Sequence, residues 1–426
     1  MNILIIAYYY PPVNSGGTMR PVQMGKHLPL LGHNISILTH SYKKDSVEPG
    51  NPQILRFRDI SYNRDRVGIC KKMQWALLRG FTEILNKCGK YHSIYSWWKN
   101  RVIRNCEKII EHTKPDAILA TYPPVETLEI GVYLSKKYNI PLISDFRDGL
   151  IFEPIETKRM SQYKCIREKY LQIEKEAISS SSAVTSIASP ITGYYKETYR
   201  VPFAEVISNA FDPNDLKDLP GDVAFDSSHF NIVFTGRFSL SEESNIVDYF
   251  FHALRSILET KDPTQAFNIR VHLVGEYRAD ELAKLSDLIE KNIVVLHGFV
   301  ERKRALAFQK AADLLLIITL PDRSSSTSAK LFEYLFTGKP ILSLTHKTVL
   351  EDIINETHTG WNVHPHQTEA IADLLWKIVS DPVFYSSLKP DWEKIEEYSI
   401  TTQMKRLDRL LFTITSHSDK IKEAKE

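Results

Sequence analysis

The sequence predicts an α/β protein with two parallel-sheet domains. Short apolar runs alternate along the chain with segments of helical length, which is typical of repeated βα units. The chain has 426 residues, enough for two domains that each bury a core. A polar stretch at 209–228, with five aspartates and two prolines, interrupts the alternation. We therefore expect a first domain over residues 1–210 and a second over residues 211–395.

Six apolar runs in each half are the expected strands. In the first half they are Ile3–Ala7, Ile35–Thr39, Ala117–Thr121, Pro141–Asp145, Ala183–Ile187 and Glu205–Ser208. In the second half they are Asn231–Gly236, Arg270–Gly275, Ile293–Gly298, Leu314–Leu320, Ile341–Leu344 and Gly360–Val363. Beyond them, apolar residues from Met404 to Leu411 recur at helical spacing, which predicts an amphipathic helix at about 396–415.

Composition indicates a soluble globular protein. Hydrophobic residues make up 43% and charged residues 25% of the chain, which are ordinary values for that class. The net charge of +2 predicts no attraction of the whole protein to nucleic acid. The first residues do not form a signal peptide, no apolar run is long enough to span a membrane, and the four cysteines form no Cys-x-x-Cys pair. We therefore expect a cytoplasmic protein with free thiols and no metal site.

One segment, residues 56–108, is strongly basic. It contains 13 Lys or Arg residues against 4 Asp or Glu residues, together with tryptophans and apolar residues. A basic amphipathic stretch with tryptophan can lie on an anionic membrane surface. The alternative is a solvated helical face whose aromatic residues belong to the core, and the sequence leaves both open.

Two adjacent glycines follow the first expected strand. Gly16 and Gly17 lie in the loop YYYPPVNSGGT, where glycines let the backbone approach a ligand closely. A Gly-Gly pair can also be a tight connecting loop, and it is not the spaced-glycine dinucleotide fingerprint. Its position directly after a strand favours the binding role.

Two other strands of the first half end in polar turns. The motif TYPP, which contains Tyr122, ends one strand, and SDFRD ends the next, so both are expected at the sheet edge that carries the glycine pair. Asp145, Arg147 and Asp148 place three charges within four residues. Such a cluster can contact sugar hydroxyls or a phosphate, or it can be a structural knot of ion pairs.

The first strand of the second half ends in Gly236 and Arg237. A guanidinium just beyond a strand end suits a diphosphate, because its planar fork binds two oxygens at once. The alternative is an ordinary surface arginine.

The segment Ser324–Leu342, SSSTSAKLFEYLFTGKPIL, predicts a loop, a helix and a strand after a very apolar run. Ser326, Thr327 and Ser328 stand where the helix begins, and their hydroxyls can cap it while the free amides bind a phosphate. Lys330 adds a positive charge. Glu333, one turn further, can accept hydrogen bonds from ribose hydroxyls or pair with Lys330 on an exposed face.

Several catalytic signatures are absent from the sequence. No Asp-x-Asp, Gly-x-Ser-x-Gly, Walker lysine loop or zinc-ligand spacing occurs. The sequence therefore gives little support to four classes of protein: a metal-clamping sugar-nucleotide enzyme, a serine hydrolase, a P-loop protein and a zinc enzyme.

Seven motifs together resemble a known family. They are YYYPPVNSGGTMRP at Tyr8–Pro21, TYPP at Thr121–Pro124, SDFRD at Ser144–Asp148, ISNAFD at Ile207–Asp212, FTGRF at Phe234–Phe238, LVGE at Leu273–Glu276 and KLFEYLFTGKPIL at Lys330–Leu342. In order and spacing they resemble the retaining GT-B-fold glycosyltransferases of the family 4 type, especially bacterial enzymes of cell-surface polysaccharide assembly. The resemblance covers nearly the whole chain. It implies two Rossmann-like domains whose parallel sheets face a central cleft, with the final helix packed back on the first domain.

The resemblance also implies a function. A sugar would move with retention from a nucleoside diphosphate sugar to a glycan or lipid-linked acceptor, in polysaccharide, O-antigen or capsule synthesis, without a metal or other cofactor. The donor-binding residues that it implies are Gly16, Gly17, Gly236, Arg237, Ser325, Ser326, Thr327, Lys330 and Glu333. The catalytic residues that it implies are Asp145, Arg147, Asp148, Arg237 and Lys330, with Tyr122 and Glu126 on the acceptor side.

Three departures from the family pattern bear on the chemistry. Ser325 occupies the place of the first of two glutamates, and no lysine follows Arg237 over residues 239–244. No histidine follows the two prolines of TYPP, where Glu126 or Glu129 could substitute. Two rival interpretations stay open: a non-catalytic nucleotide-sugar-binding pseudo-enzyme and a GT-B-fold sugar-nucleotide 2-epimerase.

Overall fold

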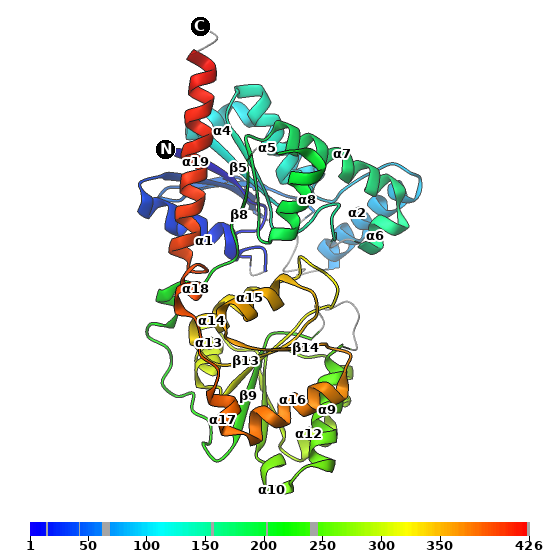
Figure 1. The fold of residues 1–426 in the computed structure, drawn as a ribbon. Helices are drawn as coiled ribbons and strands as arrows, with labels where there is room; N and C mark the ends of the chain where they lie inside the picture. The colour runs from blue at the N-terminus through cyan, green and yellow to red at the C-terminus, as the bar shows by residue number, and fades with distance from the viewer. Residues whose placement is uncertain are drawn as a thin grey trace. The chain divides into compact units, whose positions relative to one another are not determined.

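The chain folds into two α/β units (Figure 1). The computed structural model describes residues 1–13, 16–41, 43–61, 69–154, 157–201, 203–238 and 246–423. The first unit comprises Met1–Ser208 with Gln403–Glu426, and the second comprises Asn209–Thr402. The predicted class, two domains built on parallel sheets, is confirmed.

The first unit is built on an eight-stranded sheet in the order β3-β4-β2-β1-β5-β6-β7-β8. Its strands are β1 (Asn2–Ile6), β2 (Asn34–Ser41), β3 (Ser46–Glu48), β4 (Gln53–Arg58), β5 (Ala117–Tyr122), β6 (Leu142–Phe146), β7 (Ala183–Ser186) and β8 (Ala204–Val206). All neighbours pair in parallel except β3 and β4, which form an antiparallel edge. Every residue of β5 is buried, because helices cover both faces of a parallel sheet.

The helices of this unit lie on both sides of the sheet (Figure 1). They are α1 (Met19–His27), the 3₁₀ helix η1 (Leu28–Leu31), α2 (Ile69–Lys87), α3 (Ser96–Arg104), α4 (Cys106–Thr113), α5 (Val125–Tyr138), α6 (Thr157–Gln162), α7 (Lys164–Ser180), α8 (Ser189–Tyr199) and α19 (Ile400–Glu423). Helix α5 packs on β5 and contacts both α3 and α7. Helix α19 contributes Asp408, whose carboxylate lies 2.7 Å from Nε2 of His33.

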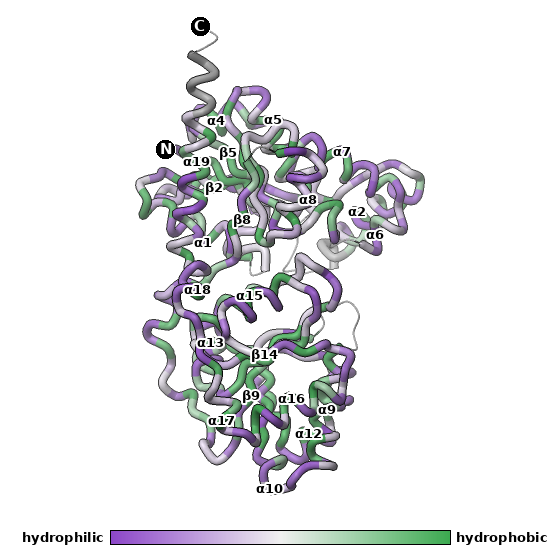
Figure 2. Tube along the Cα trace, viewed as in Figure 1, coloured by the Kyte–Doolittle hydropathy of each residue, from purple (hydrophilic) through white to green (hydrophobic). Residues whose placement is uncertain are grey.

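The second unit is built on a parallel six-stranded sheet in the order β11-β10-β9-β12-β13-β14. Its strands are β9 (Phe230–Thr235), β10 (Ile269–Val274), β11 (Val294–Gly298), β12 (Leu314–Ile318), β13 (Ile341–Leu344) and β14 (Gly360–Val363). Alternate residues of β12 enter different cores: Leu314 and Leu316 pack on one face, Leu315 and Ile317 on the other. The strand is therefore apolar at every position, as Figure 2 shows for the sheet interior.

The helices of the second unit separate into two layers. They are η2 (Pro213–Leu216, 3₁₀), α9 (Ile246–Thr260), α10 (Pro263–Ala266), α11 (Ala279–Ala283), α12 (Ser286–Glu290), α13 (Arg302–Ala311), α14 (Ala329–Thr337), α15 (Val349–Thr357), α16 (Thr368–Ser380), α17 (Pro382–Ser386) and α18 (Trp392–Glu396). Helices α9 and α16 share one apolar core, and α13, α14 and α15 share the other.

All twelve strands that the sequence predicts are present, whereas β3 and β4 were not predicted. β3 is the sheet edge and β4 lies next to it; only Leu55 of β4 is fully buried, and Arg56 interrupts its apolar residues, so β4 lacks the unbroken apolar run that identified the others. In the part of the chain that the structure describes, no helix is both long and apolar enough to cross a membrane.

Three hydrogen-bonded polar side chains inside the second unit make the stability of this unit depend on pH. His272 Nε2 lies 3.0 Å from Oδ1 of Asn231, and His272 Nδ1 lies 2.9 Å from Nε2 of His297. Burial, reinforced by the nearby His297, lowers the pKa of His272 to about 4. The folded state therefore holds this imidazole neutral.

We expect acid to destabilise the second unit through His272. The unfolded state binds the proton near pH 6.5 and the folded state only near pH 4, so stability is lost as the pH falls between these values. The loss should reach roughly 2 kcal/mol, and urea unfolding at pH 7 and pH 4.5 measures it. In His272→Gln the difference between the two pH values should shrink by this amount, and an unchanged difference would refute the assignment.

Candidate functional site

The carboxyl ends of β9, β10 and β12 bring Gly236, Gly275 and Lys330 together in the second unit. Gly236 has a φ of +108°, and a Cβ at this position would lie 2.7 Å from Nζ of Lys330. A Cβ on Gly275 would in turn collide with the carbonyl of Gly236. Both glycines are required because the two loops and the Lys330 side chain pack without room for another carbon.

Lys330 is a half-buried cation at this edge. Its ammonium lies 4.3 Å from the centre of the Phe234 ring, and burial lowers the pKa of Lys330 to about 8. Glu333 partly offsets this effect on the pKa, but among the described residues no carboxylate forms an ion pair with Lys330. Such a cation, without an ion-pair partner, provides a strong driving force for binding an anion.

The amino terminus of α14 lies in the same loop region. Its cap is Ser328, the last of the three hydroxyl residues predicted to open the helix, and its hydroxyl accepts from the amide of Lys330 at 3.4 Å. The Thr327 hydroxyl is buried, and within the described ranges it has no hydrogen-bond partner. Ser325 is also buried, and Ser326 is held by its amide, which donates to the carbonyl of Arg323 at 2.8 Å. Ser328 holds the amides of Lys330 and Leu331, so the features here that suit a phosphate are the positive end of the α14 dipole and the Thr327 hydroxyl.

Arg237 is an exposed residue at the end of β9. Its guanidinium forms an ion pair with Glu276, which follows β10. Both side chains are more than half exposed, so the pair contributes little stability and Arg237 can exchange its partner for a ligand.

Glu333 does not bond to Lys330. One of its oxygens accepts from Nη2 of Arg302 at 3.0 Å, and the other accepts from Nε2 of Gln309 at 3.1 Å. Arg302 also pairs with Asp215, so a network holds the Glu333 carboxylate in one orientation. Sequence reasoning missed Arg302 and Gln309, because α13 precedes the loop and carries no motif.

In the first unit, the loop of Gly16 and Gly17 meets Arg147. Gly16 is exposed and a Cβ there would meet no neighbour, whereas a Cβ on Gly17 would collide with Nη1 of Arg147. Nε of Arg147 lies 3.2 Å from the carboxylate of Asp148, and both side chains are partly exposed. The structure thus places the predicted Gly17, Arg147 and Asp148 in one accessible cluster.

We expect Gly17→Ala to displace the Arg147 guanidinium. The clash falls on the end of a flexible side chain, so the free energy of unfolding should change by less than about 1 kcal/mol. The rate of the reaction at this site should fall about tenfold, the cost of misplacing one charged hydrogen-bond donor. Gly193→Ala is the matched control, because a Cβ there meets nothing in α8. An unchanged rate in Gly17→Ala would show that Arg147 does not act at the site.

The predicted catalytic role of Asp145 is corrected to a structural one. The residue is fully buried, and its carboxylate accepts from Arg20 at 2.6 and 2.8 Å. The hydroxyls of Thr121 and Thr185 each donate to it at 2.7 Å, so no lone pair remains for a substrate. The Arg20 ion pair holds the pKa of Asp145 below its usual value despite burial. Sequence reasoning missed Arg20, which also donates to the carbonyl of Ile207 at 2.7 Å.

The two acceptor-side candidates, Tyr122 and Glu126, lie at the carboxyl end of β5 and in the first turn of the helix α5 that follows it. Tyr122 lines a cavity of about 310 Å³ beside the carboxyl end of β5. Glu126 lies in the first turn of α5, is almost fully buried, and accepts no hydrogen bond from the described residues. Burial raises the pKa of Glu126 to about 7.

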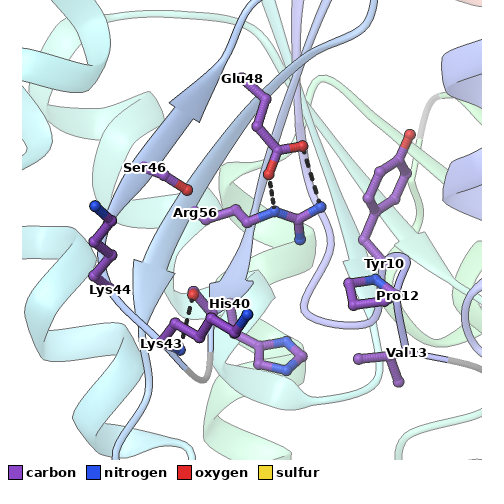
Figure 3. Close-up of a pocket in the computed structure, with 10 residues that line it drawn as sticks. Tyr10, Pro12, Val13, His40, Lys43, Lys44, Ser46, Glu48 and Arg56 are labelled. Carbon is purple, nitrogen blue, oxygen red and sulfur yellow. Dashed lines mark hydrogen bonds and ion pairs between the residues drawn. The ribbon is translucent and has the colours of Figure 1, made fainter.

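Another cavity, of about 260 Å³, lies beside the loop after β1 (Figure 3). Figure 3 shows Arg56 and Glu48 joined across it, with Tyr10 on the opposite side. Nη2 of Arg56 also donates to the carbonyl of Pro11 at 2.8 Å, so the β3–β4 edge fixes the segment that leads to the glycine pair.

Within the described ranges, no group of three His, Cys, Asp or Glu residues could hold a metal ion. Cys88, Cys106 and Cys165 are free thiols.

Most of the second unit matches a known protein family. Residues 229–381 match the family model described as glycosyl transferases group 1. The comparison with curated proteins found no match.

Solved structures share the whole fold. Sucrose-phosphate synthase from Thermosynechococcus elongatus is 16% identical with a TM-score of 0.65, over 96% of this chain and 99% of that one. Anabaena HepE, in complex with UDP and glucose, is 15% identical with a TM-score of 0.52, over 99% of both chains. An α,α-trehalose-phosphate synthase (UDP-forming) from Burkholderia xenovorans, in complex with glucose-6-phosphate, is 12% identical with a TM-score of 0.63, over 96% of this chain and 99% of that one. The two units therefore have the GT-B fold.

Proposed function

We propose that the protein is a metal-independent hexosyltransferase. It moves a sugar with retention from a nucleoside diphosphate sugar to a glycan or lipid-linked acceptor in bacterial polysaccharide assembly. The observation that carries the proposal is the Lys330 ammonium, which lies beside Gly236 and at the amino terminus of α14. The family match over residues 229–381 and the UDP bound by a protein of the same fold support it.

The donor diphosphate lies against Lys330 and the start of α14 in this proposal. The diphosphate forms an ion pair with the Lys330 ammonium and accepts a hydrogen bond from the Thr327 hydroxyl. Arg237 leaves Glu276 to bind the diphosphate, while Glu333, oriented by Arg302, accepts from the ribose hydroxyls.

Catalysis then consists mainly of stabilising the departing diphosphate. Negative charge grows on its phosphate oxygens as the sugar bond breaks, and the cations and amides that face them are already in position. The helix terminus contributes up to about 2 kcal/mol and each charged hydrogen bond roughly 1.5–3 kcal/mol. The leaving diphosphate itself takes the acceptor proton on the same face of the sugar, so the missing histidine after TYPP does not prevent the reaction.

A panel of sugar nucleotides tests the proposal. Incubation with UDP-, GDP- and dTDP-sugars and candidate acceptors should release the nucleoside diphosphate and lengthen the acceptor. Release of an epimer would indicate the 2-epimerase, and binding without turnover would indicate the pseudo-enzyme. Either outcome would overturn the proposal.

The membrane role of segment 56–108 belongs to the same proposal. Helix α2 exposes an apolar stripe, and the segment around it is basic. The exposed residues of the stripe are Met73, Leu77, Phe81 and Ile84. Their spacing places them on one face of the helix, which suits the surface of an anionic bilayer.

We expect the protein to co-sediment with anionic vesicles at low salt and not with neutral ones. Leu77 and Phe81 are 70% and 54% exposed, and replacing both with serine should reduce the bound fraction about tenfold. Val383→Ser is the matched control, because Val383 is 79% exposed in the second unit. Equal binding by the double variant and the wild type would show that the apolar stripe of α2 does not contact the membrane.

A further inference from the structure

The cavity beside Tyr122 has the dimensions of a small ligand site. Its volume of about 310 Å³ lies at the lower end of the range for ligand pockets, roughly 300–1,000 Å³. It is lined by α2 on one side and by α6 and α7 on another, and its other walls are the TYPP turn after β5 and the segment 91–95 between α2 and α3. This space accommodates one sugar ring and not an extended chain.

The walls of the cavity are rich in aromatic side chains. Six aromatic residues line it: Tyr9, Trp75, Tyr91, Tyr95, Tyr122 and Tyr170. The C–H faces of a sugar ring pack on such side chains, and a few polar groups then fix its orientation. The Tyr91 hydroxyl is buried and, in the part of the chain that the structure describes, has no hydrogen-bond partner. Filling the cavity with a hydroxylated ligand would satisfy it.

Two arginines give the cavity a positive charge. Arg79 of α2 and Arg159 of α6 both line it. The acidic residue of the lining, Glu83, already accepts from the hydroxyl of Tyr163. Burial lowers the pKa of His92, which also lines the cavity and is therefore neutral at pH 7. The planar guanidinium groups suit a phosphate or a carboxylate.

Helix α2 connects this cavity with the exposed apolar stripe. Trp75, Arg79 and Thr82 face the cavity at intervals of four and three residues. The stripe that contains Leu77 and Ile84 lies half a turn away on the opposite side of the same helix. A ligand in the cavity is therefore separated from that stripe only by the thickness of one helix.

We propose that this cavity binds the acceptor through a single sugar ring that carries an acidic group, either a phosphate or a carboxylate. The inference rests on the proposed glycosyltransferase function and names the acceptor class for it. Trp75 and the tyrosines hold the ring, the Tyr91 hydroxyl bonds to it, and Arg79 and Arg159 hold the acidic group.

Calorimetric titration of the full chain tests the inference, with UDP kept saturating so that the donor site is filled. The probes are glucose 1-phosphate, glucuronate, glucose and inorganic phosphate. One or both acidic sugars should bind, and the stronger of the two identifies the acidic group. Glucose and inorganic phosphate should each bind at least about tenfold more weakly, because each lacks half of the contacts. Absence of binding by both acidic sugars, or equal binding of inorganic phosphate, would overturn the proposal.

Variants localise the binding to the cavity. Tyr91→Phe removes only the hydroxyl and Arg79→Gln only the charge, and each should weaken acidic-sugar binding about tenfold. Arg409→Gln, an exposed position on α19, and Trp97→Leu, outside the cavity lining, are the controls and should change nothing. Unchanged affinity in both Tyr91→Phe and Arg79→Gln would place the site elsewhere. If UDP itself fails to bind, the proposed function fails; if UDP binds and the acidic sugars do not, only this inference fails.

Discussion

Replacing Lys330 with methionine is expected to weaken donor binding strongly while it stabilises the fold. The ammonium is buried beside Gly236 and Phe234, and burial lowers its pKa from 10.5 to about 8. At neutral pH the folded state therefore carries a charge that the unfolded state would hold more favourably. Methionine has a similar length and no charge, so the free energy of unfolding should rise by roughly 1–3 kcal/mol.

The same substitution removes the main cation facing the donor diphosphate. Loss of a charged hydrogen bond of roughly 1.5–3 kcal/mol should weaken UDP binding about 10- to 150-fold. Calorimetry measures the affinity, and urea unfolding measures the stability. Lys310→Met, at an exposed position in the last turn of α13, is the matched control and should alter neither. Unchanged UDP affinity in Lys330→Met would exclude Lys330 from the donor site.

Replacing Arg20 with alanine is expected to be the most destabilising single change in the first unit. The side chains of Arg20 and Asp145 are 4% and 0% exposed and are joined by two hydrogen bonds. Arg20→Ala leaves a buried carboxylate that retains only the hydroxyls of Thr121 and Thr185. Removing one partner of a buried pair costs about 3–5 kcal/mol, which urea unfolding can measure.

A surface pair provides the matched control for Arg20→Ala. Arg101 pairs with Asp45 at 2.7 Å, and these side chains are 47% and 35% exposed. Arg101→Ala should cost less than about 1 kcal/mol, because solvent screens the pair. The double change Arg20→Met with Asp145→Leu should recover much of the stability, since neither charge is then left alone. If Arg20→Ala lowers the free energy of unfolding no more than Arg101→Ala does, the buried Arg20–Asp145 ion pair does not stabilise the first unit as proposed.

The predicted and observed strands and helices differ where tertiary contacts, and not the local sequence pattern, decide the secondary structure. The strand β12 and the helix α14 could be predicted, because an apolar run buried on both faces and a glycine at the helix end are local signals. The strand β4 could not be predicted, because its apolar residues are interrupted by Arg56 and only Leu55 among them is fully buried. Local pattern therefore sufficed for elements buried on both sides and failed at the sheet edge.

The candidate site shows the same limit. The positions of Lys330 and Glu333 follow from their spacing on one helix, but the partners of Glu333 come from α13. The cluster at Asp145 has the same sequence pattern whether it faces a ligand or the interior. Its true partner, Arg20, lies 125 residues away in the chain, so only the fold reveals it.

Proton uptake on UDP binding tests the central claim most directly. If the diphosphate pairs with Lys330, binding raises the pKa of this lysine from about 8, and a proton must enter when the pH is higher. Calorimetric titrations at pH 9, in two buffers of different ionisation enthalpy, should show an uptake approaching about one proton per UDP bound, and Lys330→Met should show none. At pH 7, where Lys330 is already charged, this uptake should disappear. UDP binding at pH 9 with no proton uptake by the wild-type protein would contradict the account.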